Sequence, residues 1–301
     1  MKKFLSVLMA GAMLFGVLTL AGCGDTTTDT GEDTTTTEDT TTTAEFTTVT
    51  EGVLTMSTNA AFPPYEMTDD SGNIVGIDAE IAAAIAEKLG LELQIDDMDF
   101  DGALAAPQSG KSDIVMAGVT VNEERQLVLD FSNTYANGVQ KVIVAEGSDI
   151  TMENLGEQQI GTQKGTTGNI LTTDEFGEDH VIAYDDAIAA VQALNNGQID
   201  CVVIDSAVAD NLVEANPGLT TLDTDYANEE YAIGVAKGNT ALLDAINTAL
   251  QELIDDGTVQ SIIDKYIPTD GTAADEAGAT DEAGATDEAG ATDGAEAETA
   301  A

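Results

Sequence analysis

Basic residues are scarce in this chain of 301 residues. Nine Lys and Arg stand against 56 Asp and Glu, which gives a formal net charge of -47. A protein that binds nucleic acid needs Lys and Arg to neutralise phosphates, so this composition excludes nucleic acid as an expected partner. A large acidic excess favours solubility and says little about the fold.

Cysteine and histidine are almost absent. The chain has two cysteines, Cys23 and Cys201, and one histidine, His180. No spacing typical of zinc ligands occurs, and a single imidazole cannot build a histidine-based triad or metal cluster. Cys201 lies in the apolar run CVVID and is expected to be a small buried hydrophobic residue. We therefore expect neither a metal nor a cofactor.

The first 23 residues have the pattern of an export signal. Two lysines precede an apolar segment, residues 4–20, which is too short and wrongly flanked for a resident membrane helix. Residues 20–23 read LAGC, which resembles a lipobox and implies cleavage before Cys23 and attachment of diacylglycerol to its sulfur. This predicts an extracytoplasmic protein anchored to the membrane by lipid. An ordinary secretory cleavage near Ala21 is the alternative.

Acidic segments of low complexity flank the central part of the chain. Residues 24–46 are threonine interleaved with Asp and Glu, and the segment 269–301 contains repeats of DEAGAT. Neither composition can bury enough apolar surface to offset the entropy of the chain. We therefore expect a disordered tether and a disordered tail, with the fold between about residues 47 and 268.

The central part alternates between strand and helix patterns. Val53 to Ser57 reads as a strand, and the segment from Ile77 to Leu89 has a large apolar residue at every fourth position, as in a helix that Gly90 ends. Further strands are expected over residues 127–131, 139–145, 160–163 and 181–184, and further helices over residues 240–255 and 258–266. Such alternation predicts an α/β fold with a parallel sheet, in which ligands bind beyond the carboxyl ends of the strands. Four residues expected at that edge are Asn59, Phe62, Ala117 and Gly118.

Arg125 is the only arginine in the sequence, at the end of a brief helix expected over residues 122–125. Its planar guanidinium can pair with both oxygens of a carboxylate and stays charged at any relevant pH, which lysine cannot match. Just before it, the small residues Ala117 and Gly118 let backbone N–H groups approach a ligand, and Thr120 adds a hydroxyl. The residues alone leave two partners open, a carboxylate of the same chain or that of a ligand.

The stretch DIVMAGVTVNEERQLVLDFSNTY, residues 113–135, carries a family resemblance. It is similar to the central motif of the periplasmic-type amino-acid-binding proteins, family 3 of the solute-binding components of ABC importers. The resemblance covers about residues 50–268. It implies that Arg125 holds the α-carboxylate of the ligand, with backbone and hydroxyl contacts from the residues just before it, Ala117, Gly118 and Thr120.

Two later segments carry the same resemblance. GTQKGTTG resembles a second-lobe loop in which Thr166 and Thr167 meet the carboxylate, and it lacks the Gly-Lys-Ser/Thr order of a phosphate-binding Walker loop. DCVVIDSAVA looks like the segment whose aspartate, here Asp205, pairs with the α-amino group. Judged by spacing alone, Asp205 is equally well a helix N-cap.

The resemblance also describes a pocket for the ligand side chain. It places the rings of Phe62 and Phe100 over the ligand, with ordinary core packing as the alternative, and lets Asn59 and Gln163 help to select the side chain. This uncharged polar pair suggests glutamine, asparagine or a similar amide or hydroxyl side chain, with arginine, lysine and cystine open. Pro107 is displaced by two residues from its place in relatives, which affects the helix expected over residues 100–109.

The implied architecture is a two-lobed periplasmic-binding-protein fold of type II. Lobe 1 would combine residues 47–138 and 230–268, and lobe 2 would be residues 139–229, with two crossing strands near the joins. We expect a monomer that closes on a free L-amino acid by a hinge motion and delivers it to the permease subunits of an ABC transporter.

Two other functions fit the same architecture. One is a lipid-anchored amino-acid sensor or surface protein that uses the same pocket. The other is a dehydratase-like enzyme, which would need a general acid or base in the cleft, for which Glu66, Asp78 or Glu80 are available.

Overall fold

The computed structural model describes residues 46–223 and 225–267, all within one compact unit. The expected signal peptide with its lipidated Cys23, nearly all of the tether and the tail lie outside the described residues. Phe46, which we assigned to the tether, is half-buried and packs against the largest hydrophobic core, so it belongs to the folded part. Among the described residues, no helix has the length and apolar character that crossing a membrane requires.

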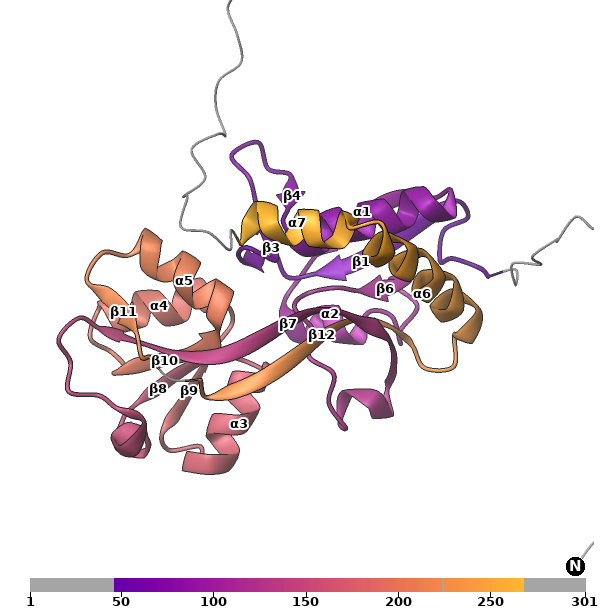
Figure 1. The fold of residues 1–301 in the computed structure, drawn as a ribbon. Coiled ribbons are helices and arrows are strands. Elements are labelled where there is room, and N and C mark those ends of the chain that lie inside the picture. Colours follow the sequence, from indigo (N-terminus) through magenta and orange to yellow (C-terminus); the bar gives the residue numbers. More distant parts are fainter. Residues whose placement is uncertain (1–45, 224, 268–301) are drawn as a thin grey trace, which may run out of the picture. The chain divides into compact units, whose positions relative to one another are not determined.

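A mixed sheet of nine strands forms the centre of the fold (Figure 1). Its order is β5-β1-β6-β12-β7-β10-β8-β9, and β11 pairs with β7. The strands are β1 (Val53–Thr58), β5 (Glu92–Asp97), β6 (Ile114–Val115), β7 (Leu129–Ala145), β8 (Ile160–Gln163), β9 (Val181–Tyr184), β10 (Cys201–Asp205), β11 (Leu219–Thr221) and β12 (Ala227–Ala236). A small antiparallel sheet contains β2 (Ala61–Phe62), β3 (Glu66–Thr68) and β4 (Ile74–Val75).

Seven helices and two 3-10 turns accompany these strands in the described part of the chain. They are α1 (Ile77–Leu89), α2 (Phe100–Ala105), η1 (Arg125–Leu127), η2 (Met152–Glu157), α3 (Thr167–Phe176), α4 (Ala187–Asn195), α5 (Ser206–Ala215), α6 (Thr240–Asp255) and α7 (Thr258–Tyr266). The apolar residues of α1 recur every four positions, so Ile77, Ile81 and Ile85 lie on one face and are fully buried. In Figure 1, α1 packs beside α6 and α7.

Two long antiparallel strands join the two parts of the sheet. β7 has 17 residues; it pairs with β12 from Leu129 to Gln140, and with β10 from Gln140 to Val144. The parallel strands β5, β1 and β6 lie on one side of this pair, and β10, β8 and β9 lie on the other. The α/β two-lobed fold of type II that the resemblance implied is confirmed, and the expected crossing strands lie within β7 and β12.

Two expected helices have different bounds in the structure. The helix expected over residues 100–109 ends at Ala105 as α2, because Pro107 has no amide hydrogen to continue the ladder and its ring clashes with the preceding turn. The brief helix expected over residues 122–125 is instead the 3-10 turn η1, which begins at Arg125.

Candidate ligand-binding site

A cavity lies at the carboxyl ends of strands from both parts of the sheet. Asn59 directly follows β1, Ala117 comes two residues after β6, and Gln163 ends β8. The residues that line the cavity are Asn59, Phe62, Glu66, Phe100, Ala117, Gly118, Thr120, Arg125, Gln140, Gln163, Thr166, Thr167, Glu229 and Tyr231. This is the edge at which open α/β sheets bind ligands.

Ten of the eleven residues predicted to contact a ligand line this cavity, and Asp205 does not. The structure thus brings these ten together, while their role as ligand contacts stays a prediction. Four further lining residues, Glu66, Gln140, Glu229 and Tyr231, were not predicted as ligand contacts, and Glu66 was named only as a possible general acid or base of the enzyme alternative. Three of the four lie in β7 and β12, so the expectation that these strands cross between the lobes was a signal that could have found them.

Hydrogen bonds join the two lobes across the cavity, and three of them link the chain before residue 138 to residues 163–167. They run from Arg125 Nη2 to the Gly165 carbonyl (3.1 Å), from Gln163 Nε2 to Asn59 Oδ1 (2.9 Å) and from Thr167 Oγ1 to Thr120 Oγ1 (2.8 Å). The free volume of the cavity is about 10 Å³, roughly what one water molecule needs. An amino acid can therefore enter only after the lobes move apart, as in hinge closure around a ligand.

Arg125 is buried in the wall of the cavity at the start of η1. Its Nη1 donates to the Thr120 carbonyl at 2.8 Å, and its guanidinium carbon lies 5.4 Å from the centre of the Phe100 ring, a cation–π contact. Burial lowers the pKa of Arg125, and the charge of Glu229 opposes this. A guanidinium has five N–H donors, and two of them are used by the Thr120 and Gly165 carbonyls. The others remain for a carboxylate.

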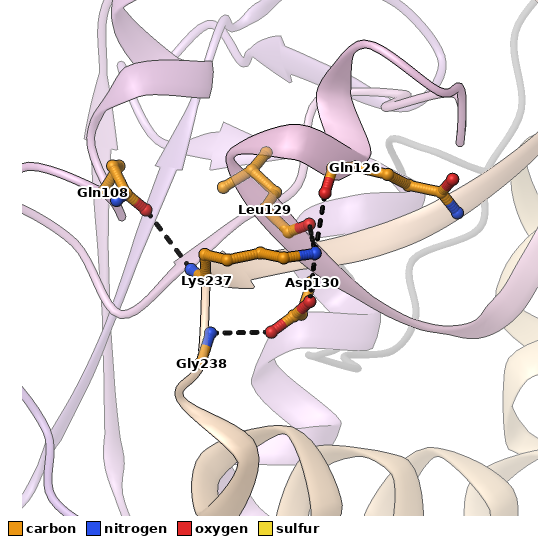
Figure 2. Close-up of polar contacts among 6 residues, drawn as sticks. All are labelled: Gln108, Gln126, Leu129, Asp130, Lys237 and Gly238. Carbon is orange, nitrogen blue, oxygen red and sulfur yellow. Dashed lines mark hydrogen bonds and ion pairs between the residues drawn. The ribbon is translucent and has the colours of Figure 1, made fainter.

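The turn that carries Arg125 is tied to the end of β12 (Figure 2). Lys237 Nζ lies 2.7 Å from Asp130 Oδ1 and donates to the Gln126 carbonyl at 2.7 Å, and the Gly238 N–H donates to Asp130 Oδ2 at 2.7 Å. These bonds satisfy a carbonyl of η1 that the short turn cannot pair itself, and they fix the position of the turn. Among the described residues, Arg125 itself forms no ion pair, so the internal salt bridge is not the arrangement observed.

Glu229 supplies a carboxylate to the same cavity from β12. Its carboxylate accepts hydrogen bonds from Thr120 Oγ1 and Gln140 Nε2, and the Tyr231 hydroxyl lies 3.5 Å from Oε1. Only 5% of Glu229 is exposed. Because a carboxylate has about four acceptor positions, Glu229 can accept a further bond from an ammonium group.

Asp205 lies behind the cavity wall. Its Oδ1 accepts hydrogen bonds from the backbone N–H groups of Ala207 (2.9 Å) and Val208 (3.2 Å), and its Oδ2 accepts one from the Tyr231 hydroxyl at 3.0 Å. Burial, followed by the charge of Glu229, raises the pKa of Asp205 to about 7. The N-cap role is thus observed, and direct contact between Asp205 and a ligand stays a prediction.

Gly138 makes this packing possible. It pairs with Glu229 between β7 and β12, and a Cβ atom at Gly138 would lie 2.4 Å from Asp205 Oδ2 and 3.0 Å from the Tyr231 hydroxyl. The first distance is shorter than real Cβ contacts and the second is tighter than most of them, so a side chain at this position would push the buried aspartate aside.

The first turn of α3 forms the opposite wall from Arg125. Thr166 is the N-cap of this helix, and its Oγ1 accepts a hydrogen bond from the Asn169 N–H at 3.3 Å. Thr166 and Thr167 both line the cavity. Free N–H groups at a helix N-terminus favour anions, so Arg125 and this end of α3 can act together on one carboxylate.

The chain is similar to known solute-binding proteins. The sequence profile of the bacterial extracellular solute-binding proteins, family 3, matches residues 54–269. A probable histidine-binding protein of Neisseria gonorrhoeae is 29% identical over 282 residues, covering 91% of this chain and 98% of the relative. The L-cystine-binding protein TcyJ of Escherichia coli K12 is 31% identical over 225 residues, covering 73% of this chain and 85% of the relative.

Solved structures give the same result. The structure of an ancestral arginine-binding protein bound to glutamine has 39% sequence identity and a TM-score of 0.69, and the match covers 72% of this chain and 99% of that chain. These relatives are amino-acid-binding proteins and not enzymes, which rules out the dehydratase-like alternative. The chain therefore belongs to the bacterial extracellular solute-binding proteins, family 3.

Proposed function

We propose that this protein captures a free, polar L-amino acid between its two lobes and delivers it to the permease of an ABC importer. The observation that carries the proposal is that Arg125 and Glu229 line one cavity, and that a loop of the other lobe meets Arg125 through the Gly165 carbonyl. A free amino acid has a carboxylate and an ammonium group at a fixed separation, so it can satisfy both residues at once.

Each end of the ligand has contacts from more than one element. The ligand carboxylate would receive hydrogen bonds from Arg125 and from the first turn of α3, at Thr166 and Thr167. Its ammonium group would donate to Glu229 and to the hydroxyl of Thr120, with Asp205 adding negative charge from behind Tyr231. Ala117 and Gly118 would contribute backbone contacts.

The side-chain pocket supports a polar ligand. The rings of Phe62 and Phe100 line the cavity, and the amides of Asn59 and Gln163 hydrogen-bond to each other across it. Charge-assisted bonds contribute about 1.5–3 kcal/mol each, whereas micromolar binding requires about 8 kcal/mol. The pocket must therefore add affinity as well as selectivity. Among relatives, the named ligands are histidine, cystine, arginine and glutamine, all of which are polar.

A thermal-shift screen tests the proposal. The protein without its first 23 residues is heated with each of the twenty amino acids, and with cystine and ornithine. A ligand present at about a thousand times its Kd stabilises the folded state by about 4 kcal/mol, which gives a clear rise in Tm. We expect a rise for one or a few polar amino acids, and none with the Arg125→Ala variant. If no amino acid raised the Tm of the unaltered protein, the proposal would fail.

We also propose that Cys23 is lipidated and holds the binding protein at the outer face of the membrane, as a monomer. The support is the LAGC sequence after an apolar leader. In cells, Cys23→Ser should move the protein from the membrane fraction to the medium or periplasm. Mass spectrometry of the unaltered protein should find a diacylglycerol-modified cysteine at its N-terminus, and an unmodified N-terminus would reject the anchor.

A further inference from the structure

Glu66 is a fully buried carboxyl group without a partner. It begins β3, lines the cavity and has no exposed surface. Among the described residues, neither Oε1 nor Oε2 has a hydrogen-bond partner. Burying an isolated ionised carboxylate costs far more than burying a neutral carboxylic acid. A bare negative charge on Glu66 is therefore not a stable state of the folded protein.

The titratable groups around Glu66 are all acidic or phenolic. They come from α1, β7, the β2–β3 connection, β5 and β10, and are Asp78, Tyr135, Tyr65, Asp97 and Asp205. Arg125 lines the same cavity, but its guanidinium donates to the Thr120 and Gly165 carbonyls. Ion pairs within residues 46–223 and 225–267 include neither Glu66 nor Asp78. Within these ranges, no cation compensates the charge of the two carboxyl groups.

Asp78 has a hydrogen bond that favours its charged form. It lies in the first turn of α1 without exposed surface, and its Oδ2 accepts a hydrogen bond from the Gly118 N–H at 2.9 Å. Its Oδ1 has no partner within the described part of the chain. Burial raises the pKa of Asp78 to about 6, and the Gly118 N–H opposes this. Burial and then the charge of Asp78 raise the pKa of Glu66 well above its usual range.

Of two adjacent buried carboxyl groups, only one can be ionised without a large cost. The N–H of Gly118 stabilises the charge on Asp78, while Glu66 has no such donor, so the proton belongs to Glu66. The backbone N–H of Asp78 donates to the carbonyl of Tyr65, the residue before Glu66, at 2.9 Å, so the two carboxyl groups come from neighbouring positions. A carboxylic acid has one O–H donor, and the unpartnered Oδ1 of Asp78 is a nearby acceptor for it.

We propose that Glu66 is a neutral carboxylic acid at pH 7 that donates a hydrogen bond to Asp78 and thereby positions the ligand-binding loop. Asp78 in turn holds the Gly118 N–H, and Gly118 lies in the loop from Ala117 to Thr120 on the cavity wall. Glu66 is thus a positioning residue; this role in binding rests on the proposed function, whereas the protonation of Glu66 does not.

The proton has a consequence for stability that can be measured without a ligand. Glutamic acid in the unfolded chain titrates near pH 4.3, and in the folded protein Glu66 keeps its proton to a higher pH. The folded state therefore binds more protons than the unfolded state above about pH 4.3, and stability falls as the pH rises. Asp78 contributes with the same sign up to about pH 6 and Asp205 up to about pH 7, so a variant of Glu66 itself is needed.

Glu66→Gln and Glu66→Leu separate the two parts of the proposal. Glutamine donates a hydrogen bond at every pH and cannot ionise, whereas leucine fills the space without a donor. Melting temperatures are measured from pH 5 to pH 9 without ligand, with Glu87→Gln as the control, because Glu87 is an exposed residue of α1. Affinity for the amino acid found in the screen is measured by calorimetry at pH 7.

We expect Glu66→Gln to melt above the unaltered protein at pH 8.5, with a difference that shrinks towards pH 5, and Glu87→Gln to show no such trend. We expect Glu66→Gln to bind within about threefold of the unaltered protein, and Glu66→Leu to bind at least about tenfold more weakly, the loss of one hydrogen bond to a charged group.

Three results would overturn the proposal. A difference in Tm for Glu66→Gln that did not change with pH would mean that Glu66 holds no extra proton. Equal affinities for the Leu and Gln variants would remove the positioning role, whether both bound tightly or both bound weakly.

If Glu66→Leu did not fold, the Gln variant alone would decide, since a large loss of its affinity would show that the charge of Glu66 is required. If no amino acid bound at all, the proposed function would fail, and the melting profiles would still decide the protonation.

Discussion

Replacing Arg125 by lysine tests the proposed carboxylate clamp most directly. Lysine keeps the charge but cannot present two parallel N–H groups to one carboxylate, and it loses the contact with the Phe100 ring, which lies 5.4 Å from the guanidinium carbon. One charge-assisted hydrogen bond contributes about 1.5–3 kcal/mol, and the cation–π contact about 0.5–1 kcal/mol. The expected loss of about 2–4 kcal/mol corresponds to a Kd that rises by roughly 30-fold to several hundred-fold.

Isothermal titration calorimetry of the unaltered protein, Arg125→Lys and the control Lys111→Ala measures this loss. Lys111 is exposed and does not line the cavity, so its removal should leave the Kd unchanged. Within the part of the chain that the structure describes, the guanidinium of Arg125 donates only to the Thr120 and Gly165 carbonyls, so we expect the Tm to change little. A Kd for Arg125→Lys within about threefold of the unaltered value would refute the assignment of two-pronged pairing.

Three further predictions follow from the residues around the cavity. The pKa of Asp205, raised to about 7, lies above its value in the unfolded chain, so the folded state binds the extra proton and the free energy of unfolding falls as the pH rises from about 4 to 7. Urea unfolding at pH 5 and pH 8 should show this fall, and Asp205→Asn should reduce it by roughly 1–3 kcal/mol; an unchanged slope would contradict the shift. Gly138→Ala should destabilise the protein by about 1–3 kcal/mol, because the added Cβ atom would lie 2.4 Å from Asp205 Oδ2. Gly102→Ala in α2 is the control; the nearest atom to its Cβ belongs to the side chain of Asp99, at 3.1 Å, so this variant should be neutral or slightly stabilising in the same assay. Lys237→Met should lower the free energy of unfolding by about 1 kcal/mol and weaken ligand binding several-fold, because it frees the turn that carries Arg125. If stability fell by this amount while the Kd stayed unchanged, Lys237 would have no role in positioning Arg125.

The elements that the sequence predicted well are those with a clear local pattern. The expected bounds of β8, β9, α6 and α7 are confirmed. In α6 the buried apolar residues recur every three or four positions, and Gly238 and Gly257 flank the helix. Gly90 ends α1 in the left-handed conformation, as its position predicted. Arg125 was identifiable as a candidate site residue because it is unique in the composition.

The features that the sequence did not predict depend on contacts between distant segments. β7 was expected as two separate strands, since its middle, SNTYANGVQ, is polar and does not alternate; it is one strand because it pairs with β12 in one lobe and β10 in the other. Glu229 could not be recognised among 56 acidic residues, and Glu66 was named only as a possible general acid or base, because only the fold decides which carboxylates are buried. The hydrogen-bond partners of Asp205 were not predictable for the same reason. Its Oδ2 accepts a hydrogen bond from Tyr231, which lies on the distant strand β12.

The pairing of β7 with β12 makes most of the second lobe an oversized hairpin loop. Gln140 and Ala227 are directly opposite each other in this antiparallel ladder, although 86 residues separate them along the chain (227 − 140 − 1). A turn of a few residues between these two positions would close the same ladder, since antiparallel strands can be joined by very short connections. The insert between them supplies Gln163, Thr166 and Thr167 to the cavity, whereas Arg125 and Glu229 lie outside it. Changes within the insert can therefore alter one wall of the pocket while Arg125 and Glu229 keep their places.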